Sequence, residues 1–300
     1  MTDLRTFTDA DGVEISYRTW RAEGTPRAVV VIAHGASEHS GRYGRLAEFL
    51  VGRGYAVYAL DHRGHGETAK ATGVGKAGPR GWSGLVDDVE ELRALAAAEN
   101  GRAPVVLFGH SMGSFVAQSY VQRYGDRLAA LVLSGSAGSI EGLEDAVGAL
   151  GAMVEQGAGD EPAGILAGFN AGFEPARTSY DWLSRDEAEV DKYIADPMCG
   201  DDAPLTIGFV HEMMRSGLEG WIPESEGRIP KDLPVLFITG ELDPVSQGAV
   251  TVRELETRYR AAGIKDVTAH YYPGARHELL NELNRDEVQD DVAAWLDRVA

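Results

Sequence analysis

A serine between two glycines is the residue of this chain best suited to nucleophilic chemistry. Residues 104–108 form an apolar run of strand length, and Gly109-His110-Ser111-Met112-Gly113 follows directly. A helical apolar pattern covers residues 115–121. A G-x-S-x-G motif between a strand and a helix is typical of a nucleophile elbow, a tight turn that exposes the serine hydroxyl. The sequence therefore predicts Ser111 as a nucleophile and places the Met112 N–H at a helix start, where an anion is stabilised.

A serine hydroxyl is too weak an acid to attack unaided, so it needs a base and an acid that orients the base. Residues 234–240 have the pattern of a buried parallel strand and lead to Asp243, and the strand expected at 267–272 leads to His277. Open α/β sheets place their sites at the carboxyl ends of strands. We expect His277 to take the serine proton and Asp243 to fix the imidazole tautomer. The chain order Ser-Asp-His is that of α/β-hydrolases.

Other residues offer the same chemistry from less suitable positions. Glu241 is the second carboxylate in its loop, but Pro244 turns the backbone that follows Asp243 outward, which favours Asp243 as the acid. Three other histidines are assigned to a strand, to an apolar helical stretch and to the turn itself: His270, His211 and His110.

The anion formed during ester cleavage requires a second backbone donor, from the loop after an early strand. Residues 28–33 form a nearly continuous apolar strand, and residues 34–39, His-Gly-Ala-Ser-Glu-His, follow it. The N–H of Ala36 is predicted to join that of Met112 in an oxyanion hole. The histidine and glycine before Ala36 are expected to brace this loop.

Composition excludes several classes of protein. The net charge is −19, which argues against nucleic-acid binding and against electrostatic docking on anionic membranes. The single cysteine excludes an internal disulfide,. The chain begins without a secretory signal and has no run of about 18 apolar residues, so a cytoplasmic protein without a transmembrane segment is expected. No metal-ligand spacing, P-loop or dinucleotide fingerprint is present, and no metal or cofactor is predicted.

Strands alternate with helices over most of the chain, which predicts an α/β fold with a mostly parallel central sheet and helices on both faces. The alternation stops between residues 136 and 232, where two helical apolar stripes occur. We therefore expect an α/β core at 1–136 and 232–300 and an inserted helical cap at 137–231. A minority of the stripe residues, with Phe209 and Met213 as candidates, is expected to face a substrate. The stripes are Leu143, Val147, Leu150 and Val154, then Leu205, Phe209, Met213 and Met214. The other expected strands are 4–8, 13–20, 55–60 and 128–134, and the expected helices lie near 42–53 and 85–95.

The combination of motifs resembles the monoacylglycerol lipase and lysophospholipase family of α/β-hydrolases. Residues 34–43, His-Gly-Ala-Ser-Glu-His-Ser-Gly-Arg-Tyr, resemble its H-G-x-G-E-H-S-x-R-Y loop, and residues 61–66 resemble its D-x-R-G-H-G loop. Residues 182–186, with 196–199, resemble its cap signature. Residues 274–282 resemble the histidine loop of bacterial members. The resemblance covers nearly the whole chain. Ser37 departs from it, since the family usually has glycine there.

This resemblance implies a capped hydrolase that acts on single-chain acyl esters without a cofactor. It also implies that Glu38 and Arg42 line the alcohol side of the pocket, where they can hydrogen-bond a glycerol. An internal salt bridge between Glu38 and Arg42 that braces the loop is an equally weighted alternative to contact with a glycerol. Cys199 is a pocket-wall thiol by resemblance or a small apolar cap residue, and not a catalytic one.

Together these features predict a serine carboxylesterase whose substrate is a small amphiphilic ester, a monoacylglycerol in the first place. A lysophospholipase and a broad short-chain esterase are alternatives of the same class. A binding protein that retains the scaffold without turnover is the alternative from another class. Contact with a membrane surface is expected to be at most transient and to occur through the cap. The oligomeric state cannot be read from the sequence.

Overall fold

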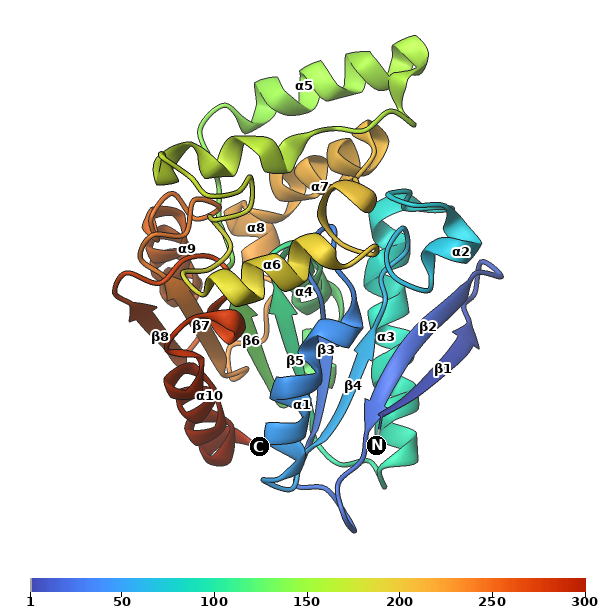
Figure 1. The fold of residues 1–300 in the computed structure, drawn as a ribbon. Coiled ribbons are helices and arrows are strands. Elements are labelled where there is room, and N and C mark those ends of the chain that lie inside the picture. Colours follow the sequence, from blue (N-terminus) through green and yellow to red (C-terminus); the bar gives the residue numbers. More distant parts are fainter. Residues whose placement is uncertain (1) are drawn as a thin grey trace.

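The computed structural model describes residues 2–300 and has the predicted α/β architecture (Figure 1). Within these residues the strands form one sheet in the order β1-β2-β4-β3-β5-β6-β7-β8. β2 runs antiparallel to β1 and β4, and the remaining described neighbours are parallel. The strands are Thr2–Thr8 (β1), Glu14–Trp20 (β2), Val29–Ala33 (β3), Ala56–Leu60 (β4), Val105–His110 (β5), Ala130–Ser134 (β6), Val235–Gly240 (β7) and Val267–Tyr272 (β8).

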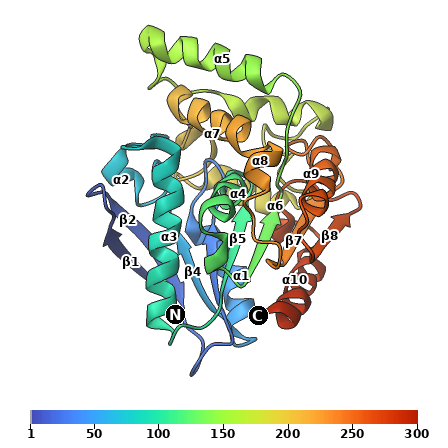
Figure 2. The ribbon, with the colours of Figure 1, turned by 180° about the vertical axis from the view of Figure 1, so that it is seen from behind.

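Helices cover both faces of this sheet, as Figures 1 and 2 show from opposite sides. The apolar sides of α3, α4 and α9 pack on one face, and those of α1 and α10 pack on the other. The helices are Gly44–Val51 (α1), Ala69–Thr72 (α2), Gly81–Glu99 (α3), Met112–Tyr124 (α4), Leu143–Met153 (α5), Glu187–Ala195 (α6), Ile207–Gly220 (α7), Pro223–Glu226 (α8), Val250–Ala261 (α9) and Arg285–Val299 (α10).

The central strands β3 to β7 are buried throughout and mostly apolar because both of their faces are covered,. In β3, Val29 and Val31 contact the α3 side while Val30 and Ile32 contact the α1 side, as the alternation of side chains along a strand requires,. Each such side chain contributes about 1.5–3 kcal/mol by leaving water. The expected strand and helix positions are confirmed to within a few residues. The helix expected from residue 42 differs, since a 3-10 turn at Ser40–Tyr43 precedes α1.

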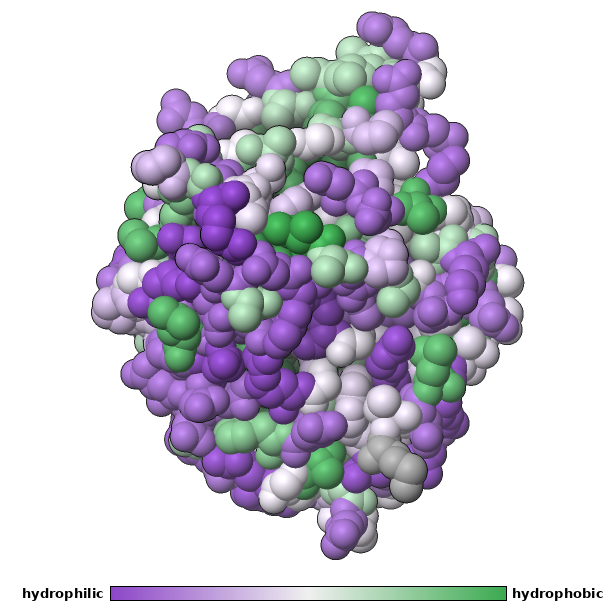
Figure 3. Space-filling model, in the orientation of Figure 1, coloured by the Kyte–Doolittle hydropathy of each residue, from purple (hydrophilic) through white to green (hydrophobic). Residues whose placement is uncertain are grey.

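The chain between β6 and β7 forms a helical layer over the carboxyl ends of the strands (Figure 1). α5, α6, α7 and α8 lie in this segment, with a 3-10 helix at Ile165–Phe173. α7 contacts α3 and α4 of the core, and α5 lies on α7. Weakly apolar residues gather on the outer part of this layer, whereas polar residues cover most of the core face below it (Figure 3). The division into two domains at residues 136 and 232 stays a prediction.

Candidate active site

Ser111 lies at the sharp turn that joins β5 to α4. Its backbone has φ 51° and ψ −123°, a conformation that L-residues rarely adopt and that the elbow imposes,. The turn is tight because glycines flank it. A Cβ on Gly109 would lie 2.5 Å from the carbonyl oxygen of Gly113, and a Cβ on Gly113 would collide with the carbonyl oxygen of Ala33. The Ser111 N–H donates to the Ser134 carbonyl at 2.9 Å, which fixes the turn against β6.

His277 and Asp243 form a buried hydrogen-bonded pair. Both residues follow carboxyl ends of strands, β8 and β7, and their exposed fractions are 2% and 0%. The distance from His277 Nδ1 to Asp243 Oδ1 is 2.9 Å. The Val245 N–H donates to the same carboxylate oxygen at 2.9 Å. Because an ionised carboxylate only accepts hydrogen bonds, Nδ1 carries the proton and Nε2 has a free lone pair.

The environment of His277 favours its charged form. Burial lowers the pKa of an imidazole, but here the charge and hydrogen bond of Asp243 outweigh burial, and Glu278 and Glu38 add to them, so the pKa lies above the ordinary 6.5. His110, whose ring centroid lies 4.9 Å from that of His277, behaves oppositely. Burial and the neighbouring His277 lower its pKa to about 4. His110 is therefore neutral. Its Nδ1 lies 3.3 Å from the Ser134 hydroxyl, a contact that supports the turn.

The rival candidates lie elsewhere. Glu241 is paired with Arg253 at 3.0 Å. His270 lies on β8, with its Nδ1 3.4 Å from Asp291. His211 neighbours Glu212 on α7 at 3.9 Å.

The loop after β3 brings Ala36 to the same cavity as Ser111 and Met112. Met112 is the first residue of α4, whose first N–H groups have no acceptor within the helix,. Ser37 has φ 52°, in the left-handed region where a glycine is the unstrained choice,. Its carbonyl accepts hydrogen bonds from the Gly200 N–H at 3.0 Å and the Tyr193 hydroxyl at 2.9 Å. The loop thus keeps the conformation that a glycine would give, and the cap holds it in place.

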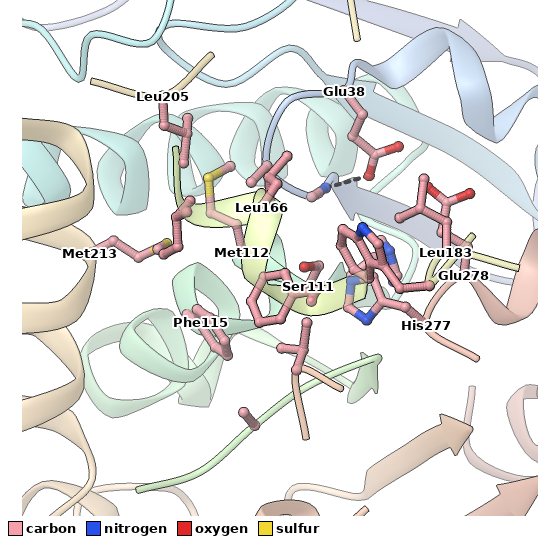
Figure 4. Close-up of a pocket in the computed structure, with 18 of the residues that line it drawn as sticks. Glu38, Ser111, Met112, Phe115, Leu166, Leu183, Leu205, Met213, His277 and Glu278 are labelled. Carbon is pink, nitrogen blue, oxygen red and sulfur yellow. Dashed lines mark hydrogen bonds between the residues drawn. The ribbon is translucent and has the colours of Figure 1, made fainter. Parts of the chain in front are cut away.

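Ser111 and His277 line a cavity of about 140 Å³ between the core and the cap. Figure 4 shows Ser111 between two unlike ends of this cavity. Glu38, Glu278 and His277 lie on one side. The other end is apolar, with Phe115, Leu205 and Met213 (Figure 4). An ester with one apolar chain and one polar alcohol matches this division.

Two carboxylates share the guanidinium of Arg42 at the polar end. Arg42 donates to Glu38 at 2.7 Å and to both carboxylate oxygens of Glu278 at 2.5 and 2.7 Å. Glu38 also accepts from the Gly35 N–H at 2.5 Å and the Tyr43 hydroxyl at 2.8 Å. Burial raises the pKa of a carboxyl, but the charge of Arg42, the neighbouring His110 and His34 and the hydrogen bond from the Gly35 N–H lower that of Glu38 to about 2. Glu38 lines the cavity. Arg42 forms internal salt bridges with Glu38 and Glu278, which is the alternative to direct contact with a glycerol.

The structure corrects one predicted contact and places two others. Phe209 is not among the residues that line the cavity, because its ring packs on His65 and Trp82 with centroids 5.5 and 6.5 Å away. The prediction that Phe209 faces the substrate is wrong. Met213, one turn further along α7, does line the cavity (Figure 4). Cys199 packs inside the cap, and burial raises the pKa of its thiol.

Three further residues line the cavity that the sequence does not predict there: Glu278, Tyr193 and Trp182. Glu278 directly follows the predicted base in the sequence, and this adjacency indicates that it lies near the cavity. Trp182 stacks against His277 with ring centroids 5.0 Å apart, but it comes from a cap segment whose position the sequence does not give.

Comparison with known proteins gives the family. A model described as serine aminopeptidase, S33, matches residues 24–284. The monoacylglycerol lipase of Mycolicibacterium smegmatis is 32% identical over 294 residues, which cover 97% of this chain and 95% of that protein. This chain belongs to the monoacylglycerol lipase family. The monoglyceride lipase of Homo sapiens is 31% identical over 98% of this chain and 90% of its own length.

Solved structures give the same fold. A thermostable carboxyl esterase from Bacillus coagulans, solved in complex with glycerol, superposes with a TM-score of 0.92. It is 27% identical, and the match covers 99% of this chain and 98% of that one. The chain is a carboxylic ester hydrolase of the lipase type with the α/β-hydrolase fold. Among residues 2–300, no helix is both long and apolar enough to cross a membrane.

Proposed function

We propose that this hydrolase cleaves single-chain acyl esters, monoacylglycerols above all, through an acyl-enzyme on Ser111. The observation that carries the proposal is the cavity itself, whose apolar and polar ends meet at Ser111. In this mechanism His277 Nε2 takes the proton of the Ser111 hydroxyl as its oxygen attacks the ester carbonyl. Asp243 holds the imidazole and stabilises its charged form. The N–H groups of Ala36 and Met112 bind the oxyanion.

The second half of the reaction uses the same groups. His277 gives its proton to the departing alcohol oxygen, and the ester bond breaks to leave an acylated Ser111. A water molecule then loses a proton to His277 and attacks the acyl carbonyl, which releases the acid and restores the serine hydroxyl.

The apolar end of the cavity is suited to the acyl chain. Met213 and Leu205 of the cap and Phe115 of α4 line it. Each buried methylene contributes about 0.8 kcal/mol, so four more carbons contribute about 3 kcal/mol. Binding therefore improves with chain length until the cavity is full.

The polar end of the cavity favours an uncharged, hydroxyl-rich alcohol. Glu38 and Glu278 present carboxylate oxygens, which accept hydrogen bonds from hydroxyl groups,. One guanidinium lies between these two carboxylates, so the group carries a net negative charge. A phosphate on the leaving alcohol would face like charge. This favours a monoacylglycerol over a lysophospholipid with an accessible phosphate.

The roles of the three residues are tested by substitution. Ser111→Ala is expected to lower kcat by about 10⁴-fold or more while the far-ultraviolet circular dichroism stays unchanged, because no covalent attack is possible without the hydroxyl. Asp243→Asn is expected to lower kcat by several orders of magnitude through the wrong imidazole tautomer. Glu241→Gln is the matched control and retains activity. A Ser111→Ala enzyme with more than a few per cent of activity, or a Glu241→Gln enzyme with less activity than Asp243→Asn, contradicts the assignment.

The substrate class is tested with esters below their critical micelle concentrations. We expect kcat/KM for monoacylglycerols to rise from acetyl to a maximum at medium or long chains. At equal chain length, monoacylglycerol is expected to exceed lysophosphatidic acid and lysophosphatidylcholine. Emulsified triolein is the control, because its two extra chains have no space in the cavity.

A maximum at acetate would instead support a short-chain esterase, and faster turnover of the lysophospholipids would support a lysophospholipase. Absence of turnover together with absence of labelling by a fluorophosphonate would support a binding protein.

A further inference from the structure

A second cluster of reactive side chains lies outside the catalytic group. His39 follows β3, whereas Asp196 and Cys199 follow α6 in the cap. One ligand atom from each of these three residues lies within 4.8 Å of the other two. His39 is separated from Asp196 by 157 positions, so no local spacing in the sequence reveals the group.

The three side chains are held in place and sheltered from water. His39 and Cys199 are 6% and 2% exposed, and a quarter of the Asp196 side chain remains open to solvent. His39 Nε2 lies 2.9 Å from Asp196 Oδ2, and the Gly41 N–H donates to His39 Nδ1 at 3.2 Å. The imidazole therefore carries its proton on Nε2. The Met198 N–H donates to Asp196 Oδ1 at 2.9 Å and orients the carboxylate.

We propose that His39, Asp196 and Cys199 form a binding site for Zn²⁺. A thiolate, an imidazole and a carboxylate are a ligand set that Zn²⁺ accepts, with a water molecule as the fourth ligand. On binding, the Cys199 thiol loses its proton to solvent and its sulfur coordinates the metal. The imidazole keeps one proton, which moves from Nε2 to Nδ1 while Nε2 coordinates, and the hydrogen bond from the Gly41 N–H to Nδ1 is lost. The Asp196 carboxylate coordinates as an anion and keeps the hydrogen bond from the Met198 N–H at Oδ1.

Occupation of this site would act on the active site through the loop after β3. Zn–S and Zn–N bonds of about 2.3 and 2.0 Å place tetrahedral ligand atoms about 3.5 Å apart. His39 Nε2 and Asp196 Oδ2 lie only 2.9 Å apart, so these two atoms must separate before both can bind one metal ion. The ligand segments must therefore shift. The Gly200 N–H donates to the Ser37 carbonyl, next to Ala36, so this movement displaces the proposed oxyanion donor. Displacements of about 1 Å at a reacting centre cost up to about a hundredfold in rate. We expect Zn²⁺ to inhibit.

Binding is tested on the whole protein with zinc chloride by isothermal titration calorimetry. We expect one equivalent to bind, with release of one proton, which measurements in buffers of different ionisation enthalpy detect. Cobalt(II) in place of zinc should give a thiolate-to-metal charge-transfer band in the near ultraviolet. Cys199→Ser should abolish this band and weaken Zn²⁺ binding at least about tenfold. His270→Gln, a histidine beside an aspartate outside the cluster, is the matched control and should change neither.

The binding result stands without the proposed function, and only the inhibition rests on it. Equal zinc affinity and an unchanged cobalt spectrum in Cys199→Ser would overturn the site. Zinc inhibition that persists unchanged in Cys199→Ser would show that the metal acts at His277 instead. Binding without inhibition would retain the metal site and overturn its link to the Ser37 loop.

Discussion

Glu278 lies where it contacts both the cavity and the surroundings of the proposed base. It follows His277 in the chain, lines the cavity and accepts two hydrogen bonds from Arg42. Burial alone would lower the pKa of His277, and the charge of Asp243, assisted by that of Glu278, reverses the effect. The residues around the imidazole thus make it a stronger base than a free histidine.

This raised pKa sets the pH dependence of catalysis. As the proposed base, His277 must be neutral to accept a proton, so kcat/KM should fall with decreasing pH, with an acid limb above the ordinary 6.5,. Glu278→Gln removes a negative charge that stabilises the imidazolium, and should move this limb to lower pH. Glu241→Gln, which removes a carboxylate outside the cavity, should leave it in place. The check is a pH profile of kcat/KM for all three proteins with an uncharged ester. A wild-type limb below 6.5, or no shift in Glu278→Gln, would contradict the stated cause.

At the scale of elements, the loop after β3 is strained at a single residue. Ser37 has φ 52°, and its hydroxyl is buried without a hydrogen-bond partner among the described residues. Its carbonyl, by contrast, accepts the two hydrogen bonds that fix the loop to the cap. The backbone conformation is therefore needed, while the side chain contributes little.

Ser37→Gly is accordingly expected to stabilise the protein by up to about 1 kcal/mol. Glycine removes the left-handed strain, and its greater freedom in the unfolded chain offsets part of the gain. Ser37→Ala keeps the strain and should give no gain, which makes it the matched control. Urea denaturation of the three proteins measures the difference. Equal stabilisation by alanine would point to the buried hydroxyl instead of the backbone.

The strands and the order of the catalytic candidates could be predicted because each depends on local patterns. β3 and the first four residues of β5 and of β7 are uninterrupted apolar runs, and Ser111, Asp243 and His277 each follow the end of a strand. Parallel strands bring such ends to one edge of a sheet, so proximity follows from the pattern alone.

The cavity walls could not be predicted in the same way. An apolar stripe on α7 is compatible with core packing and with substrate contact, and Phe209 and Met213 differ only in what distant segments place beside them. The choice between the two roles of Arg42 depended likewise on Glu278, 236 positions away.

At the scale of the whole molecule, buried neutral histidines connect stability to pH. His34, His62, His65 and His110 are at most 6% exposed, and burial lowers the pKa of each below 6.5. The ring centroids of His62 and His65 lie 4.7 and 5.1 Å from that of His34. Protonation of any of these residues would introduce a charge into an interior without solvent.

The free energy of unfolding should therefore begin to fall as soon as the pH drops below the ordinary histidine pKa. A histidine with a lowered folded pKa contributes fully above the unfolded value of 6.5, and its contribution is lost as pH falls toward the folded value, about 3 for His65,. Each proton taken up on unfolding costs about 1.4 kcal/mol per pH unit. We expect the free energy of unfolding in urea to decrease between pH 6.5 and 5, above the range of most carboxyl groups. Asp88, Glu91 and His277 oppose this trend. Burial raises the pKa of Asp88 to about 7 and also raises that of Glu91, and Asp243 raises that of His277.

His65→Asn should reduce the slope by about one proton, and the partly exposed His270→Gln should not change it. A flat dependence over this range, or equal slopes in the two variants, would mean that the buried rings do not control acid stability.

The charges around the cavity also affect release of the proposed acid product. Under the proposed function, hydrolysis of a neutral ester produces a carboxylate in a cavity lined by Glu38 and Glu278, within a chain of net charge −19. The ester meets no such repulsion, because it carries no charge. The reaction therefore turns a neutral molecule into an anion that the two carboxylates repel, and this repulsion favours release of the acid product. Salt screens the repulsion, so we expect release of the acid to slow as ionic strength rises.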